Sequence, residues 1–211
     1  MATRHAPQRR RQKNKKSVSS KAVFAGIVFA VLAVAAVLLA ANCQHNTREK
    51  VQNMSYPRSY SDYVNASALK YNLDPALVFA VIRTESSFEP SAGSSAGACG
   101  LMQITHDTFD HYRSLRGEED VYSDEDIFDP EVNIDYGCNI LRDHLDTFGN
   151  EECAVAAYNA GPGNVESWLE DPNISKDGKT LIVEKIPFDE TRDYVDKVED
   201  AKEMYIKLYY S

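Results

Sequence analysis

The sequence predicts a mostly helical protein, in which one globular helical domain follows a single N-terminal transmembrane helix. An unbroken apolar segment near the N-terminus predicts the membrane helix. Apolar side chains recur at helical spacing in the remainder, and two Asp-Pro pairs, Asp74-Pro75 and Asp129-Pro130, are typical helix starts. We divide the chain into a basic cytoplasmic tail (1–21), a transmembrane helix (22–41), a linker (42–57) and the domain (58–211).

Residues 22–41 are twenty consecutive apolar residues or glycines. At about 1.5 Å per residue they span roughly 30 Å, the thickness of a bilayer's hydrocarbon core. The 21 residues before them carry eight basic side chains and no acidic one, so the positive-inside rule keeps this tail in the cytoplasm. This pattern predicts a single-pass protein of the cell membrane with an extracytoplasmic domain.

Two other interpretations of the N-terminal segment remain. A cleaved signal peptide usually has a shorter apolar region, and Leu39–Asn42 is a poor cleavage site. Cys43 directly after the segment suggests a lipoprotein, but Asn42 stands where a small residue would be expected. We therefore favour the uncleaved anchor.

The charge of the chain differs sharply between the tail and the rest. Beyond residue 21 there are 15 basic and 32 acidic side chains, a net charge of −17. This acidity argues against binding to nucleic acid, which needs a positive surface. The five histidines have no ligand spacing, so we expect no metal and no cofactor. Cys99 could pair with Cys138 or Cys153, but a free thiol is equally compatible with each position.

Within the domain, a first helix is expected at Tyr60–Lys70, with Ser61 available as its N-cap, and a second starts at Pro75. A weaker helix at Thr105–Leu115 and an acidic, irregular connection at Arg116–Asp129 follow. The remaining expected elements are a helix at Pro130–Phe148, short helices at Glu151–Tyr158 and Val165–Leu169, a loop at Asp171–Lys185 with a brief strand at Leu181–Val183, and an amphipathic helix at Asp189–Tyr209.

Glu85 lies at the end of the second helix, which is apolar nearly all round from residue 76 to 82. It follows Ile82 by three residues, Val81 by four and Val78 by seven, so it shares their face of the helix. Burial at the end of an apolar stripe raises the pKa of a carboxyl group. Such a carboxylic acid stays protonated near neutral pH and can act as a general acid. A solvated glutamate at a helix end is the competing interpretation.

A loop of small residues follows Glu85. Gly93, Gly97 and Gly100 interrupt a run of serines and alanines, which leaves too few large side chains for a core segment. Such a loop suits a backbone that passes close to a bound molecule. An apolar pattern then resumes at residues 101–104 and includes the amide side chain of Gln103.

Four motifs in order carry a resemblance to a known family. They are Glu85-Ser86-Ser87-Phe88, Gly100-Leu101-Met102-Gln103, Ala157-Tyr158-Asn159-Ala160-Gly161-Pro162-Gly163 and Ile186-Pro187-Phe188-Asp189-Glu190-Thr191-Arg192-Asp193-Tyr194-Val195. Together they resemble the motifs of lytic transglycosylases of the soluble-lytic-transglycosylase (SLT) type, over roughly residues 60 to 205. The resemblance implies a lysozyme-like fold of the α+β superfamily and cleavage of peptidoglycan glycan strands. Protein partners are not indicated.

The resemblance also implies a mechanism with one catalytic carboxyl group. Glu85 would protonate the oxygen between N-acetylmuramic acid and N-acetylglucosamine, then take a proton from the C6 hydroxyl group as a 1,6-anhydro ring closes. The substrate-binding residues it implies are Ser94, Met102, Gln103, Tyr158, Asn159 and Tyr194. Ser94 could instead be a plain loop serine, Met102 a core residue, and Asn159 purely structural.

Departures from the family's pattern are small. Glu89 replaces a more usual asparagine and could alter the electrostatic field around Glu85, while Glu190 and Arg192 are expected to form an ion pair or a cap. Two alternatives to the transglycosylase remain. One is a muramidase of the same fold that hydrolyses the same bond, and the other is a non-catalytic wall-binding domain of a secretion apparatus.

Overall fold

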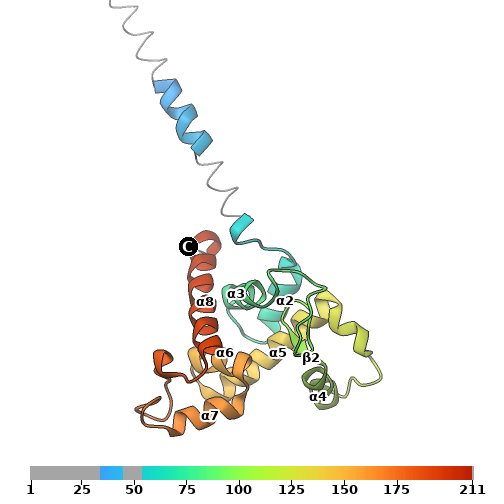
Figure 1. Cartoon of the computed structure of the whole chain (residues 1–211). Coiled ribbons are helices and arrows are strands. Elements are labelled where there is room, and N and C mark those ends of the chain that lie inside the picture. Colours follow the sequence, from blue (N-terminus) through green and yellow to red (C-terminus); the bar gives the residue numbers. More distant parts are fainter. Residues whose placement is uncertain (1–33, 45–53, 211) are drawn as a thin grey trace, which may run out of the picture. The chain divides into compact units, whose positions relative to one another are not determined.

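The structure is a computed structural model that describes residues 34–44 and 54–210. The chain divides into two units, residues 1–51 and 52–211, which we describe separately. In the first unit, residues 34–44 form a helix (Figure 1). The basic tail (1–21) and residues 22–33 of the expected transmembrane helix lie outside the described residues. No helix in the described part of the chain is both long enough and apolar enough to cross a membrane.

The second unit is mostly helical, as predicted. Its α-helices are α2 (Ser61–Lys70), α3 (Pro75–Ser86), α4 (His106–Arg116), α5 (Pro130–Phe148), α6 (Glu151–Ala160), α7 (Pro162–Glu170) and α8 (Asp189–Tyr205). The 3-10 turns Asp124–Phe128 and Val183–Lys185 and a π-helical turn, Ile206–Tyr210, are shorter. The strands β1 (Ala98–Cys99) and β2 (Ile104–Thr105) form an antiparallel hairpin in which Cys99 faces Ile104.

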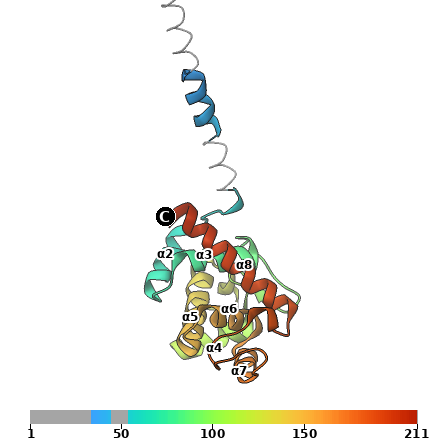
Figure 2. The same cartoon turned by 90° about the vertical axis from the view of Figure 1, so that its left-hand side faces the viewer.

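Helix α3 lies at the centre of this unit, between α8 and α2 (Figures 1 and 2). It starts as the sequence predicts, because the Asp74 carboxylate accepts a hydrogen bond from the backbone N–H of Ala76 and Pro75 fills the first position. Its residues 76–82 are all buried. Each large apolar side chain of this run contributes about 1.5–3 kcal/mol on burial, so packing rather than helix propensity fixes α3.

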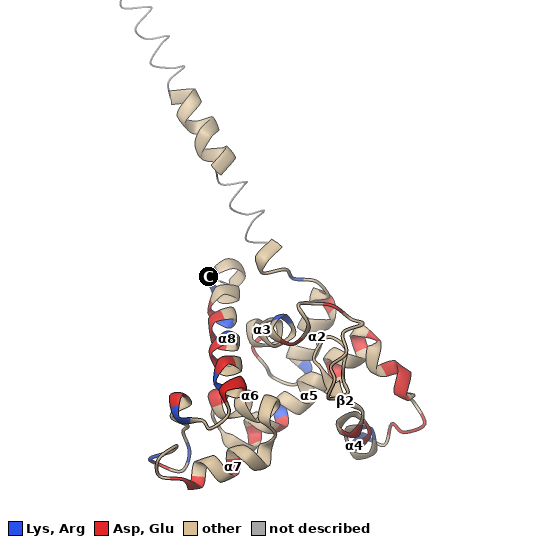
Figure 3. Ribbon diagram, viewed as in Figure 1, with Lys and Arg blue, Asp and Glu red and all other residues tan. Residues whose placement is uncertain are grey.

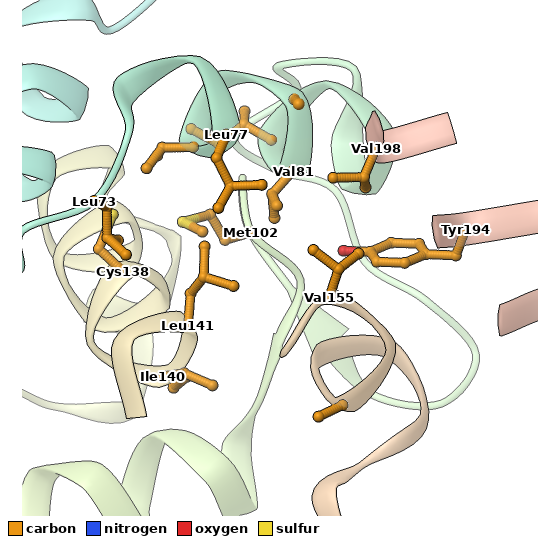
Figure 4. Packing of buried hydrophobic residues seen from close by; sticks show 14 of the residues in the cluster. Leu73, Leu77, Val81, Met102, Cys138, Ile140, Leu141, Val155, Tyr194 and Val198 are labelled. Carbon is orange, nitrogen blue, oxygen red and sulfur yellow. The ribbon is translucent and has the colours of Figure 1, made fainter. Parts of the chain in front are cut away.

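Helix α5 forms the second support of the core and packs against α6 and α2. Asp129 caps it by accepting from the N–H groups of Glu131 and Val132, and Gly149 ends it in the left-handed conformation. Figure 4 shows Cys138 and Leu141 of α5 facing Leu77 of α3, with Met102 between them. The loop that carries Met102 is therefore held between the buried faces of α3 and α5.

Several local predictions differ from the structure. Tyr60, with a φ of 60°, takes the N-cap position of α2, so Ser61 is not its cap. The brief strand at residues 181–183 is absent, and a 3-10 turn begins at Val183 instead. Helix α7 begins at Pro162, earlier than predicted, because a proline at the first helical position needs no backbone donor. Cys99, Cys138 and Cys153 are all buried free thiols.

Candidate active site

Glu85 occupies the last turn of α3, next to the terminal Ser86. Ser87 and Phe88 both have positive φ, 52° and 68°, so the chain leaves the helix abruptly. The carboxyl group of Glu85 is half-buried and accepts a hydrogen bond of 2.7 Å from the hydroxyl of Tyr194. The predicted position of Glu85 at the end of the buried stripe thus agrees with the structure.

Burial raises the pKa of Glu85 to about 7. The hydrogen bond from Tyr194 stabilises the charged form and lowers this pKa, while the nearby negative charge of Glu190 raises it. No Lys or Arg forms an ion pair with Glu85 among the residues the structure describes. A carboxyl group with a pKa near neutrality can both give and accept a proton at physiological pH.

Tyr194 reaches Glu85 from α8 and is almost fully buried (6% exposed). Figure 4 shows its ring extending from α8 alongside Val155 of α6. The same end of α8 is joined to α6 by a hydrogen bond of 2.8 Å from the hydroxyl of Thr191 to the side-chain oxygen of Asn159. Asn159 thus links two helices that meet at the site, which agrees with its structural interpretation.

Tyr158, near the end of α6, donates a hydrogen bond of 2.9 Å from its hydroxyl to the backbone carbonyl of Met102. Its pKa lies well above the ordinary tyrosine value, first because of burial and then because of the negative charge of Glu85. Tyr158 and Tyr194 are therefore both neutral phenols beside the carboxyl group. Their motifs, far apart in the sequence, meet at Glu85.

The Met102 side chain is fully buried (0% exposed) and packs against the α-carbon of Gly137 in α5. This corrects the expectation that it lines a cleft, because a side chain without exposure belongs to the core. Gln103 has a φ of 49°, and its amide nitrogen donates to the carbonyls of Ala92 and Gly100, at 3.2 and 2.9 Å. Gln103 thereby ties the glycine loop to the hairpin.

Ser94 lies exposed in the loop before β1. Its hydroxyl oxygen accepts hydrogen bonds from the N–H groups of Ala96 and Ala98, at 3.2 and 3.1 Å. Among the described residues, no hydrogen bond joins Ser94 to Glu85. The structure therefore supports the loop-forming interpretation of Ser94, whereas a contact with substrate stays a prediction.

A pocket of about 390 Å³ opens on one side of Tyr158, between α4 and the end of α6. Its aromatic lining includes Tyr112 and the ring of His144, which contacts the Tyr158 ring edge-on at a centroid distance of 6.4 Å. Burial lowers the pKa of His144, so this ring is neutral at pH 7. The pocket provides aromatic faces next to a residue of the candidate site.

Two functional contacts escaped the sequence analysis. Ser86, beside Glu85, donates from its hydroxyl to the carbonyl of Leu101 at 2.8 Å, and Asn133 of α5 accepts from the N–H of Met102 at 2.7 Å. Asn133 is fully buried. A polar residue in the apolar face of the helix at Pro130–Phe148 was the available signal, since buried polar groups are almost always hydrogen-bonded.

The acidic neighbour that acts on Glu85 also differs from expectation. Glu89 is fully exposed and bonds to Ser91, and it does not contribute to the shifted pKa of Glu85. Glu190 does contribute. Arg192 pairs with Asp189 rather than with Glu190 and also donates to the carbonyl of Ile186. Glu190 therefore raises the pKa of Glu85 through its negative charge.

The fold and the site define a class. A half-buried carboxyl group of raised pKa, flanked by two neutral tyrosines on a mostly helical domain, is typical of glycan-cleaving enzymes that use a carboxylic acid as the proton donor. Residues 62–181 match the family model of the transglycosylase SLT domain. The chain belongs to this family.

Curated relatives agree with this assignment. The chain is 35% identical over 144 residues to the soluble lytic murein transglycosylase of Salmonella typhimurium, a match that covers 68% of this chain and 22% of that protein. It is 32% identical over 166 residues to the membrane-bound lytic murein transglycosylase C of Shigella sonnei, covering 69% and 46%. The chain thus spans less than half the length of either relative.

Solved structures confirm the lysozyme-like, mostly helical lytic transglycosylase fold. The 70-kDa soluble lytic transglycosylase of Escherichia coli superposes with a TM-score of 0.64 at 34% identity, over 72% of this chain and 25% of that one. An inactive glutamate-to-glutamine mutant of the lytic transglycosylase Slt from Pseudomonas aeruginosa gives 0.65 at 35% identity, over 72% and 24%. A complex of the 70-kDa enzyme with bulgecin A gives 0.66 at 32% identity, over 74% and 25%.

Proposed function

We propose that this protein is a membrane-anchored lytic transglycosylase that cleaves the β-1,4 bond between N-acetylmuramic acid and N-acetylglucosamine in peptidoglycan. The observation that carries the proposal is the half-buried Glu85, which accepts a hydrogen bond from Tyr194 where three family motifs meet and whose pKa is raised by burial to about 7. The curated relatives are lytic murein transglycosylases, which supports the same substrate class.

In the proposed reaction, the protonated Glu85 donates its proton to the glycosidic oxygen as the bond from C1 breaks. The substrate's own N-acetyl oxygen stabilises the positive charge at C1. The Glu85 carboxylate then removes the proton from the C6 hydroxyl group, whose oxygen closes onto C1 to form 1,6-anhydro-N-acetylmuramic acid. Glu85 returns to its starting state and no water is consumed. A pKa near 7 suits both steps, since neither protonation state is strongly disfavoured.

The two tyrosines would assist this cycle in different ways. Tyr194 donates to Glu85 at 2.7 Å and so stabilises the carboxylate that forms after the first proton transfer. Tyr158 commits its hydroxyl proton to Met102, which leaves its phenol oxygen as an acceptor for a sugar hydroxyl or N-acetyl N–H. Gln103 and Asn159 would shape the loop and helix end that face the sugar.

Product analysis tests the reaction. Purified protein is incubated with peptidoglycan sacculi, and the soluble fragments are analysed by mass spectrometry. We expect 1,6-anhydro ends, which are lighter by one water than reducing ends. Reducing ends alone would instead indicate a muramidase of the same fold, because water would then have attacked C1.

The Glu85→Gln substitution tests the role of the carboxyl group, because glutamine keeps the shape but cannot transfer a proton. We expect a loss of about 10²–10⁴-fold in the rate of fragment release, the usual contribution of general acid–base catalysis. Glu125→Gln, at an exposed position of the 3-10 turn Asp124–Phe128, is the control and should keep wild-type activity. Wild-type rates in the Glu85 variant would reject the mechanism.

Anchoring by residues 22–41 is part of the proposal and rests on the apolar segment and its basic flank. We expect the full chain to stay with the membrane fraction after washing in high salt and to be released by detergent. Protease added to intact spheroplasts should remove the domain and spare the tail. Release of the domain into the medium would instead indicate a cleaved signal peptide.

A further inference from the structure

The peptide unit that joins Leu101 to Met102 is held from both sides by side chains, the partly buried Ser86 and the fully buried Asn133. On one side, the hydroxyl of Ser86 donates to the Leu101 carbonyl at 2.8 Å. On the other side, the Asn133 side-chain oxygen accepts from the Met102 N–H at 2.7 Å. The next carbonyl along the chain, that of Met102, accepts from Tyr158 at 2.9 Å. One short backbone segment thus connects the α3 end that carries Glu85, the interior of α5 and the end of α6.

Asn133 is the most constrained of these side chains. It is 0% exposed and makes three hydrogen bonds, because its amide nitrogen also donates to the carbonyls of Cys99 and Ile127, at 3.1 and 2.7 Å. Gly100 passes so close that an added β-carbon would lie 2.3 Å from this nitrogen. The glycine and its φ of +76° are therefore required for the turn to reach Asn133.

Gly137 extends the same surface one helical turn further along α5, since residues four apart share a helix face. A β-carbon at Gly137 would lie 2.3 Å from the Met102 sulfur and 2.8 Å from its β-carbon. Asn133 fixes the backbone of Met102 by a hydrogen bond, and Gly137 fixes its side chain by close packing. Helix α5 therefore sets the position of Met102 in two independent ways.

We propose that Asn133 is a positioning residue for the active site, which sets the place of the Tyr158 hydroxyl through Met102. Asn133 is fully buried, and its three hydrogen bonds go to Met102, Cys99 and Ile127 rather than to Glu85. Its influence passes from the Met102 N–H to the Met102 carbonyl, and from there to the phenol beside Glu85. The inference deepens the proposed function and rests on it where turnover is the readout.

Kinetics of the full chain in detergent test this path. Asn133→Leu removes all three hydrogen bonds at similar volume, and we expect kcat to fall about 10- to 100-fold with KM changed less than about threefold, since displacements of about 1 Å have such effects. Asn133→Asp keeps the acceptor for Met102 and, protonated by burial, still donates one bond, so it should restore part of the rate. In a Tyr158→Phe background, Asn133→Leu should lower kcat by less than about threefold further.

The matched control is Ser175→Ala. Ser175 is also a buried polar residue, and its hydrogen bonds go to Asp177 and Gly178 in another loop. This variant should lower Tm and leave kcat unchanged. An equal loss of kcat from Asn133→Leu in both the wild-type and the Tyr158→Phe backgrounds would overturn the proposal, because Asn133 would then act independently of the Tyr158 hydroxyl.

A substrate-free measurement separates this inference from the proposed function. The chain has four methionines, so labelling them with ¹⁵N and a ¹³C carbonyl gives a simple NMR spectrum of the full chain. Asn133→Leu should shift the Met102 carbonyl signal in the same direction as Tyr158→Phe, and an unmoved signal would overturn the proposal. If Asn133→Leu unfolds, Asn133→Ala, which removes the same three hydrogen bonds without adding an apolar branch, takes its place in both experiments. An inactive wild type would reject the function while this spectrum still decides the positioning.

Discussion

Two clusters of ionisable side chains in this domain differ in whether their carboxyl groups have cationic partners. On the side formed by α2, α5 and the connection after α4, Arg116 bridges Glu118 and Asp135 at 2.9 and 2.8 Å, and Lys70 binds Asp135 at 2.7 Å. At the end of α3, the neighbours that act on the Glu85 carboxyl group within the described residues are the hydroxyl of Tyr194 and the like charge of Glu190. Acidic residues lie along most helices of the domain (Figure 3), and of these two clusters the first pairs its carboxylates with cations.

The fold thus places ion pairs that support stability apart from the carboxyl group that supports the chemistry. In the Arg116 cluster each carboxylate has a positive partner, and the Arg116 guanidinium also lies over the Tyr136 ring at 4.1 Å. Such a cluster holds the end of α4, the connection after it and α5 together through ion pairs. The Glu85 site omits the cation and thereby keeps a proton within reach of pH 7. Substitutions in the two clusters should therefore affect different observables.

The pH dependence of stability gives the largest expected contrast. The folded-state pKa of Glu85, about 7, exceeds its unfolded value of 4.5. Below pH 4.5 the group is protonated in both states and costs nothing. Between these values unfolding releases a proton, so stability falls as pH rises, and above pH 7 the full cost of about 3 kcal/mol is present. Glu85→Gln should abolish this loss, as measured by urea unfolding from pH 4 to 8.

Glu89→Gln is the matched control for that experiment. Glu89 lies four residues further on, and its hydrogen bonds with Ser91 lower its pKa, so its linkage has the opposite sign and adds stability as pH rises. Removing Glu89 should therefore leave the wild-type decline in place. If the free energy of unfolding changed with pH in the same way for wild type and Glu85→Gln, the Glu85 carboxyl group would be as well solvated in the folded state as in the unfolded state.

Breaking the other cluster should have a smaller effect on stability and little on activity. Arg116→Met leaves Glu118 and Asp135 without their shared partner, and we expect unfolding to become easier by about 2 kcal/mol, less than for a fully buried pair because water reaches the edge. Arg142→Met, which breaks a surface pair with Asp146, should cost under about 1 kcal/mol. If Arg116→Met lowered kcat as strongly as it lowered the stability of the fold, the two clusters would be coupled.

Much of the fold was predictable because its signals are local. Asp74-Pro75 and Asp129-Pro130 start α3 and α5 in the structure as the sequence indicates, and Gly149 ends α5. The hairpin β1/β2 was not predicted, because two residues per strand give no alternating pattern. The register that pairs Cys99 with Ile104 depends on tertiary contacts with α5 rather than on its own residues.

The candidate site was predictable to a lesser extent. Glu85 could be identified because burial follows from helical spacing, and a raised pKa follows from burial. That Glu190 rather than Glu89 acts on it could not be predicted, because this depends on how the start of α8 lies against the end of α3. Met102 shows the same limit, since an apolar residue in a loop motif fits a core and a cleft equally well until its exposure is known.

Tyr194→Phe removes the hydrogen bond from the Tyr194 hydroxyl that stabilises the Glu85 carboxylate. The pKa of Glu85 should then rise above its wild-type value, because burial is left without this opposing contribution. We expect the pH profile of kcat to move upward and the rate at pH 7 to fall by roughly 10-fold. Tyr205 lies on the same helix as Tyr194 and donates a hydrogen bond of 2.8 Å to the Pro57 carbonyl. Tyr205→Phe removes this bond and should leave the pH profile of kcat unchanged.

Glu190→Gln should give the smallest change and the opposite sign. The charge of Glu190 raises the pKa of Glu85, so its removal should lower that pKa and shift the pH profile of kcat downward. Because Glu190 is exposed, salt should screen the effect, and the shift measured at about 0.01 M salt should shrink at about 0.15 M. Glu203→Gln changes the net charge equally at the far end of α8 and should produce no shift. If both variants shift the pH profile of kcat alike, Glu85 responds to the net charge of the domain. The pKa of Glu85 would then be set by burial and overall acidity rather than by the position of Glu190.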